Sequence, residues 1–156
     1  MIDLRFSIPE RSSPLYRSWE RARQEDLKAI GETELQYYLL YVHIVFALDG
    51  VEFISTDEVV TLVDFMQGVS WVAENIASHR DASIGFTEHA DTISFRWTKS
   101  GIHVSSPRAP SGIYVNSDNL MKTFHTFLEN AISCLAREIP GIEDNPTIRA
   151  VRHPRS

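Results

Sequence analysis

The sequence contains few of the residues that mark covalent or metal-dependent chemistry. Its single cysteine, Cys134, excludes a disulfide within the chain and favours a reducing compartment. The seven glycines are scattered and form neither of the glycine-rich loops that hold phosphate groups. Paired cysteines, a His-x-x-x-His pattern and an Asp-x-Asp loop are also missing, which excludes the usual zinc and calcium signatures. We therefore expect no cofactor and no bound metal.

Long hydrophobic runs are missing as well. The longest one, residues 37–48, is interrupted by His43 and is too short to span a bilayer. The first thirteen residues lack an apolar core of signal-peptide length. These two observations predict a cytoplasmic protein that does not enter a membrane.

Positive charge is scarce and is concentrated at the C-terminus. The chain of 156 residues, 43% of them hydrophobic, suits one domain with a single core and carries a formal charge of −6. Residues 149–156 contain Arg149, Arg152 and Arg155 and no acid, and removing these three positive charges from −6 leaves −9 for the remainder. We expect a folded domain over residues 1–148 and a basic, flexible tail over residues 149–156.

The acidic body limits the kinds of partner that the protein can have. It repels phosphate backbones, which disfavours nucleic-acid binding. It would attract a basic protein partner and speed the association with it. The alternative is that the acidic surface serves solubility alone.

The first half of the sequence predicts strands, a hairpin and a surface helix. Apolar and polar residues alternate over residues 2–8, which predicts a half-buried strand. Residues 14–29 are rich in charge and in helix formers, and predict a surface helix. Residues 35–48 are apolar on both strand faces, which predicts a central strand covered on both sides. The Asp49-Gly50 pair predicts a hairpin, with residues 51–54 as the returning strand.

The second half predicts helices on either side of a β-meander. Ser55 and Glu58 match a capping box, so we expect a helix over residues 57–77. Four alternating segments between residues 82 and 115 predict antiparallel strands that follow one another. A final helix over residues 117–139 begins at a run of N-cap residues and is stopped by a proline and a glycine. The apolar residues of the meander share one face: Ile84, Phe86, Ile93, Phe95, Trp97, Ile102, Val104, Ile113 and Val115.

Together these elements predict a single α+β domain. We expect a mostly antiparallel sheet of about six strands that packs against two long amphipathic helices. The N-terminal helix would cover part of the other face. We expect the sheet to be broken at residues 107–110, where two prolines occur, and the chain to be irregular from Gly141 onwards.

Three titratable clusters could carry chemistry, but each has a structural interpretation that we favour. The segment Glu88-His89-Ala90-Asp91 would lie at a hairpin tip, where charged residues are ordinary turn composition. His103 and Ser105 are neighbours on one strand face, but nothing supplies an oxyanion loop. His79 and Asp81 form a weak metal-binding pattern at a helix end. Because no catalytic constellation is visible, we expect the protein not to be an enzyme.

His43 suggests an alternative function. It lies on the most apolar strand, and with Tyr37 and Tyr41 it could line a pocket for a small molecule or for catalysis. We favour a neutral, hydrogen-bonded core histidine. Cys134 is interpreted as a small core residue, because it lies on the apolar side of its helix.

One helix face could bind a partner. On the helix expected from residue 57, Val60, Asp64, Gln67 and Trp71 recur at spacings of four, three and four on the side opposite the buried stripe. Tryptophan is enriched among the residues that dominate binding energies, so Trp71 is a candidate anchor. The alternative is that Trp71 folds back under the N-terminal helix near Trp19.

The outward face of the meander is the second candidate surface. Its mixture of polar and aromatic side chains suits a wet interface, although an ordinary solvated sheet face has the same composition. The candidate partner-binding residues on it are Arg96, His103 and Tyr114, beside Thr92, Ser94 and Ser105.

The order of these elements resembles that of a known class of bacterial proteins. The chain contains the segments LVDFMQGVSWVAENI, IGFTEHADTISFRW and GIHVSS, followed by a helix that closes in IPGIEDNP. This pattern resembles that of small bacterial proteins, several of which are similar to immunity proteins. Immunity proteins neutralise toxins that are delivered between competing bacteria. The resemblance covers residues 49–146 and carries over no functional residue. It implies a cytoplasmic protein that binds and masks a cognate toxin. Many such toxins are basic nucleases, which agrees with the acidic body.

Three functions therefore follow from the sequence as hypotheses. The leading one is a non-enzymatic inhibitor that occludes a cognate bacterial toxin. The second is a small-molecule-binding or enzymatic domain with a pocket near Tyr37, Tyr41 and His43. The third is a structural subunit of a homo-oligomer.

Overall fold

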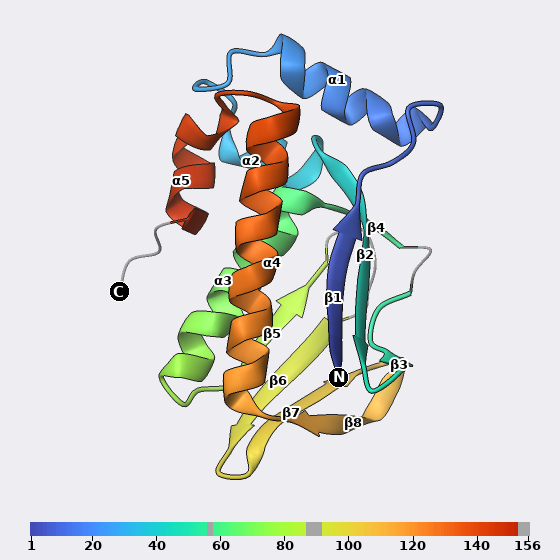
Figure 1. Ribbon diagram of the computed structural model, residues 1–156, viewed down its shortest axis with the longest axis vertical. Helices are drawn as coiled ribbons and strands as arrows, with labels where there is room; N and C mark the ends of the chain where they lie inside the picture. The colour runs from blue at the N-terminus through green and yellow to red at the C-terminus, as the bar shows by residue number, and fades with distance from the viewer. Residues whose placement is uncertain (56–57, 87–91, 153–156) are drawn as a thin grey trace.

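The chain folds into two separate β-sheets joined by helices. The computed structural model describes residues 1–55, 58–86 and 92–152. Over these residues it contains two antiparallel sheets of four strands each, together with helices that pack along them (Figure 1). The α+β class is confirmed. The expected single sheet of about six strands is wrong, because the N-terminal strands and the meander form different sheets.

The first sheet is built around one central strand. Both β1 and β4 run antiparallel to β2, β1 on one side and β4 on the other, where the short β3 also pairs with the end of β2. The residues of β2 alternate between buried and half-buried, so one face is fully covered and the other only in part. Asp49 and Gly50 have φ values of 50° and 82°, as a tight two-residue hairpin requires, and the predicted hairpin is confirmed. Its returning strand ends at Glu52, two residues before the predicted end. The strands are β1 (Ile2–Ser7), β2 (Tyr41–Leu48), β3 (Val51–Glu52) and β4 (Val59–Thr61).

The helix predicted over residues 14–29 is confirmed in a shorter form, and a second helix occupies part of the predicted strand. A 3-10 turn, η1 (Pro14–Tyr16), leads into α1 (Arg17–Gln24), which ends five residues before the predicted end. A second helix, α2 (Glu32–Tyr37), occupies the start of the expected strand. Leu40 then adopts a left-handed backbone, with a φ of 61°, and turns the chain into β2. A run that is apolar at nearly every position fits a buried helix end as well as a strand, so periodicity could not separate the two.

The helix predicted over residues 57–77 begins later than expected. The β-branched residues of β4 pair with β2, and α3 (Leu62–Ala77) starts only after Thr61. Residues 56–57, which belong to the predicted capping box, lie outside the described residues. At its other end α3 closes with His79 in the left-handed conformation, where the His79 and Arg80 amides donate to carbonyls of the last turn. This type of helix end usually uses glycine, so a histidine in that place does not signal it in advance.

The second sheet is the predicted meander. Its strands follow one another in space as in sequence, and the inward residues Phe95 and Val104 face each other across β6 and β7. Pro110 lies inside β8 and does not break the sheet, because β8 is an edge strand where a missing N–H group is tolerated. The strands are β5 (Ala82–Gly85), β6 (Thr92–Thr98), β7 (Gly101–Ser106) and β8 (Ala109–Val115).

The C-terminal part is more ordered than the sequence predicts. The helix α4 (Ser117–Glu138) is capped by Asn116, whose side chain accepts from the Asn119 amide. Beyond it the chain forms η2 (Ile142–Asp144) and α5 (Pro146–Arg152), where irregular chain and a tail from residue 149 were expected. Buried Asn145 explains part of this order, because its side-chain amide donates to two backbone carbonyls of the segment between α1 and α2. The helix therefore extends through Arg152.

All eight phenylalanines of the chain lie in two aromatic clusters that connect the sheets with the helices. In the first, Phe95 of β6 contacts Phe46 of β2 and Phe124 of α4, with ring centroids 6.1 and 5.7 Å apart. In the second, Phe127 of α4 contacts Phe6 of β1 and Phe65 of α3, at 5.7 and 5.4 Å. Phe53 joins the first cluster and Phe86 the second. α4 therefore reaches both sheets through two side chains that are three residues apart.

Replacing Phe95 by alanine should destabilise the whole domain. Its ring is 1% exposed and bridges the two sheets, so Phe95→Ala should lower the free energy of unfolding by about 3–5 kcal/mol. Urea denaturation measures this loss. Tyr38→Ala, which removes a ring that is 58% exposed, is the control and should change it by about 0.5 kcal/mol or less. Similar losses in both variants would contradict the bridging role of Phe95.

Candidate functional site

A side-chain hydrogen bond joins the outer surfaces of α2 and α3, and an exposed tryptophan lies on α3. The Gln36 side-chain amide donates to Glu32 Oε1 at 3.0 Å and to Gln67 Oε1 at 2.8 Å, which ties the two helices together. Gln67 lies one helical turn before Trp71, on the same side of α3. Trp71 is 58% exposed, and its carbonyl accepts from Asn75 Nδ2 at 2.8 Å. We call Glu32, Gln36, Asp64, Gln67 and Trp71 the acidic helix face.

The sequence segment that contains α2 and α3 is one-sided in charge. Residues 29–79 contain eight acids and no lysine or arginine. Glu34 and Glu52 pair at 3.9 and 3.8 Å with arginines from outside this segment, Arg21 and Arg108. Within the described part of the chain, Glu32 has no cationic partner. A count of charges by segment would have found this feature in the sequence, whereas the net charge of the whole body conceals it.

The structure corrects one member of the predicted helix face. Val60 lies in β4, is 2% exposed and pairs with Val42 of the central strand, so it cannot contact a partner. It was misplaced because the helix was expected to start before it. Asp64 and Gln67 are half-buried on α3. Trp71 does not pack under the N-terminal helix: Trp19 there is fully buried, while most of Trp71 is exposed.

The predicted residues of the meander do lie together, on the outer face of the second sheet. The strand register places Arg96 beside His103 and His103 beside Tyr114, in one row across β6, β7 and β8. The ring centroids of His103 and Tyr114 are 4.8 Å apart, and Tyr114 is 57% exposed. We call these three residues the outer sheet row.

His103 is held in place by backbone contacts. Its Nε2 lies 3.1 Å from the carbonyl oxygen of Ser111. Gly112 permits this approach, because a Cβ atom there would lie 2.5 Å from the same nitrogen, and its φ of 69° also suits glycine. The imidazole is thus engaged by the neighbouring strand, which leaves it poorly placed to activate Ser105.

Tyr41, His79 and Asp81 have structural partners, whereas His43 is only half-buried on β2 and does not have the core position expected for it. Tyr41 donates its hydroxyl to the carbonyl of Tyr37 at 2.6 Å. The His79 ring stacks on Trp97 with centroids 4.4 Å apart, and Asp81 accepts from the Trp97 amide at 2.9 Å. No three histidine, cysteine or carboxylate side chains of the described residues could hold a metal together. The segment 88–91 lies outside the described residues.

Cys134 lies in the core, as its helix pattern predicts. The residue is 6% exposed, and burial raises the pKa of its thiol above the usual range despite the nearby Arg137 guanidinium. A raised pKa keeps the thiol protonated at neutral pH and therefore a weak nucleophile.

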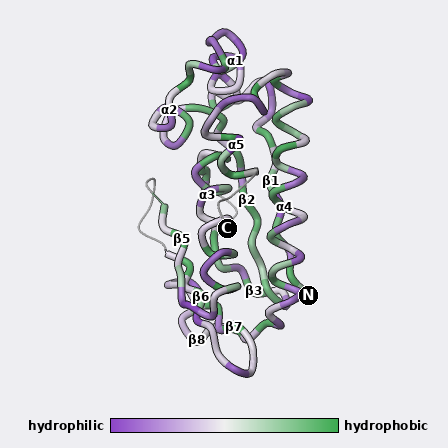
Figure 2. The backbone as a smooth tube through the Cα atoms, turned by 90° about the vertical axis from the view of Figure 1, so that its left-hand side faces the viewer, coloured by the Kyte–Doolittle hydropathy of each residue, from purple (hydrophilic) through white to green (hydrophobic). Residues whose placement is uncertain are grey.

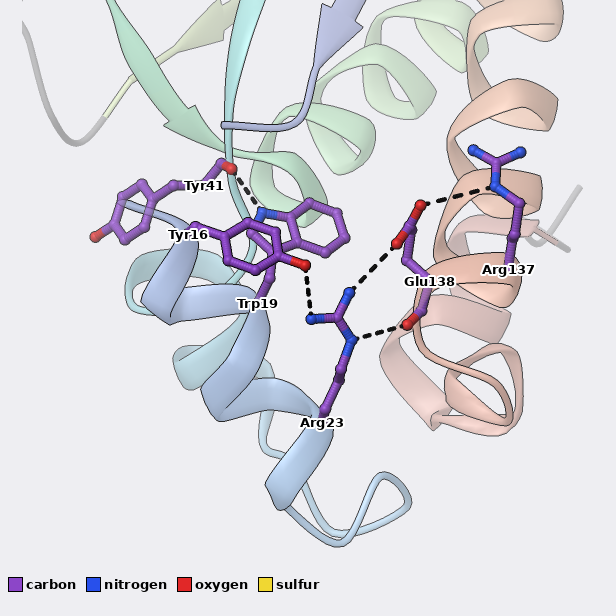
Figure 3. A network of polar contacts seen from close by, with 6 residues as sticks. All are labelled: Tyr16, Trp19, Arg23, Tyr41, Arg137 and Glu138. Atoms are coloured by element: carbon purple, nitrogen blue, oxygen red, sulfur yellow. Dashed lines mark hydrogen bonds and ion pairs between the residues drawn. The ribbon is translucent and has the colours of Figure 1, made fainter. Parts of the chain in front are cut away.

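The densest polar network fastens α1 to the end of α4 (Figure 3). Arg23 donates to the Tyr16 hydroxyl at 3.0 Å, and to the backbone carbonyl and the carboxylate of Glu138 at 3.0 and 3.3 Å. The Glu138 carboxylate also lies 3.8 Å from Arg137. On the other side of α1, Trp19 Nε1 donates to the Tyr41 carbonyl at 2.8 Å. Apart from the Arg137–Glu138 contact within α4, these contacts join different elements of the fold, so the network is structural.

Comparison with protein families, with curated proteins and with solved structures found no match for this chain. None of the described helices combines the length and the apolarity that crossing a bilayer requires.

Replacing Arg23 by lysine should loosen α1 without unfolding the domain. Lysine keeps the charge but lacks the planar fork through which Arg23 reaches three separate acceptors with Nε, Nη1 and Nη2. The α1 amides should therefore exchange hydrogen faster, while the global free energy of unfolding falls by about 1 kcal/mol or less. Hydrogen-exchange mass spectrometry measures the first quantity and urea denaturation the second. Arg21→Lys, whose two ion pairs are 3.9 and 4.0 Å long on an exposed surface, is the matched control. Equal exchange in the two variants would contradict this role of Arg23.

Proposed function

We propose that this protein is a non-enzymatic binding protein that occludes a basic protein partner through the acidic helix face, with Trp71 as the anchor. A cognate bacterial toxin is the class of partner that the resemblance to immunity proteins implies. Occlusion needs no catalytic group. It needs only a surface that matches the active-site surface of the target in charge and shape.

One observation supports this proposal above the others. A tryptophan that is 58% exposed lies on a helix of a 51-residue segment that has eight acids and no lysine or arginine. A large exposed aromatic ring provides apolar area for a partner, and tryptophan is enriched among dominant binding residues. The negative charge of Glu32 and Asp64 on the same helix face would steer a basic partner towards the ring and would repel acidic proteins.

The outer sheet row suits a basic partner less well. It carries Arg96 in its row and the exposed Lys99 in the following turn, and both would repel a positively charged surface. Tyr114 nevertheless offers almost the same exposed fraction as Trp71, 57% against 58%. The two aromatic residues are therefore a matched pair for testing which surface binds.

Trp71→Ala should weaken binding of the partner protein, and Tyr114→Ala should leave it unchanged. Tagged wild-type protein and both variants are used to capture proteins from the cells in which the chain occurs, and the bound proteins are identified by mass spectrometry. We expect a stoichiometric basic protein with the wild type and with Tyr114→Ala. With Trp71→Ala the affinity should fall by about 2 kcal/mol or more, roughly thirtyfold, as measured on the purified pair by calorimetry. The opposite pattern would transfer the binding role to the sheet row.

The charge on the helix face should control the rate of association. Glu32→Lys reverses a charge that has no cationic partner among the described residues, so the association rate should fall about threefold to tenfold at low salt, and the effect should shrink as salt is raised. Stopped-flow mixing with the purified partner measures both quantities. Glu10→Lys makes the same change of charge outside the acidic segment, at an exposed position, and is the control. Equal slowing by the two variants would indicate only a general effect of net charge.

A further inference from the structure

An apolar groove lies between α3 and α4, apart from the surfaces described above. It is open to solvent, has a volume of about 1010 Å³, and is bordered by Val151 of α5. Figure 2 shows α3 and α4 running along the length of the molecule, with α5 beside them. The α3 wall consists of Ser70, Ala73 and Glu74, and the two small residues leave room for an incoming helix. The apolar residues of the α4 wall are Met121, Phe124, Leu128 and Ile132.

The α4 wall has the residue spacing of a helix-pairing seam. Met121, His125, Leu128 and Ile132 all line the groove and are spaced four, three and four residues apart, as alternate core positions of a heptad are. Three of the four are apolar, and Met121, Leu128 and Ile132 remain only partly buried in the single chain. The seam thus has apolar side chains that the fold itself does not fully cover.

Two opposite charges flank this seam on the same side. Lys122 and Glu129 are seven residues apart, each directly after a core position, and both line the groove. The equivalent positions on the other side of the seam are Phe124 and Ala131, which are buried against the rest of the domain. Charged side chains therefore lie on one side of the seam only, and Glu129 there also lies 3.0 Å from His125 Nε2 of its own chain.

We propose that a second copy of this chain docks in the groove, through antiparallel pairing of the two α4 helices about a twofold axis. The seam is filled when Met121 packs against Ile132 of the second copy and His125 packs against Leu128 of the second copy. The same register places Lys122 beside Glu129 of the second copy, and the twofold axis repeats this contact. A parallel pairing would set each charge against the buried side of the other seam.

Self-complementarity is what identifies the occupant as a second copy. A seam that binds a different protein does not need charges that complement one another. Here the twofold rotation that packs the apolar residues of the two copies together also brings Lys122 of each copy beside Glu129 of the other. The proposal is independent of the proposed function, because it concerns the isolated protein. The experiment below needs no partner, so its failure would leave the occlusion proposal untouched.

Charge exchange at residues 122 and 129 tests the pairing. The mass in solution is measured by sedimentation equilibrium over a range of concentrations for the wild type, Lys122→Glu, Glu129→Lys, the double variant, and an equal mixture of the two single variants. Lys99→Glu is the control, because it makes the same change of charge as Lys122→Glu but in an exposed turn. Circular dichroism confirms that each variant is folded.

The pairing predicts a specific pattern of masses. The wild type, the control and the double variant should be dimers. Each single variant should dimerise at least about tenfold more weakly, because both flanking contacts become repulsive. The mixture should recover dimers. A heterodimer of the two single variants has one acidic and one basic side chain at each of the two flanking contacts. A monomeric wild type at every concentration, single variants as dimeric as the wild type, or a mixture that stays monomeric would each overturn the proposal.

Discussion

The contact between α4 and both sheets through Phe124 and Phe127 is the constraint on which the rest of the structure depends. Neither sheet could be stable alone, because a four-stranded sheet needs a cover for its apolar face. Phe124 reaches the meander through Phe95, and Phe127 reaches β1 and α3. Phe46 then joins the sheets directly through Phe95. Because the rings meet mostly edge to face or tilted, their geometry fixes the orientation of the two sheets as well as their distance.

The position of α3 follows from this constraint and decides which residues are presented to solvent. Phe65 holds α3 in the second aromatic cluster, and Gly68 lies so close to Ile84 that a Cβ atom would be 3.1 Å from it. With one side of the helix held against the core in this way, Trp71 is turned outward. The polar contacts of Arg23 act differently: they fasten a short helix onto the outside of a core that is already complete.

The sequence predicted the second half of the fold well and the first half poorly, for physical reasons. The meander has one apolar face and clear turns, so strict alternation determined which residues point inward, from Ile84 to Val115. Residues 35–40 are apolar on nearly all sides and only the left-handed Leu40 separates helix from strand, which periodicity does not reveal. The same ambiguity placed Val60 on a helix surface, whereas it lies in a strand. Trp71 and the outer sheet row lie where local spacing alone placed them. The segment without lysine or arginine was missed because only the charge of the whole body was considered.

The two proposed surfaces are compatible because they lie on different sides of α3. At about 100° per residue, Trp71 is turned roughly 100° from Ser70 and 160° from Ala73, while Glu74 at the edge of the groove is turned about 60° from it. Pairing through α4 would therefore leave each acidic helix face open and would place two of them on one particle. A target with a single basic site would then bind to each face separately, in a two-to-two complex. A target that is itself a dimer could engage both faces at once, and its dissociation would slow without any new contact, because the second binding step becomes intramolecular.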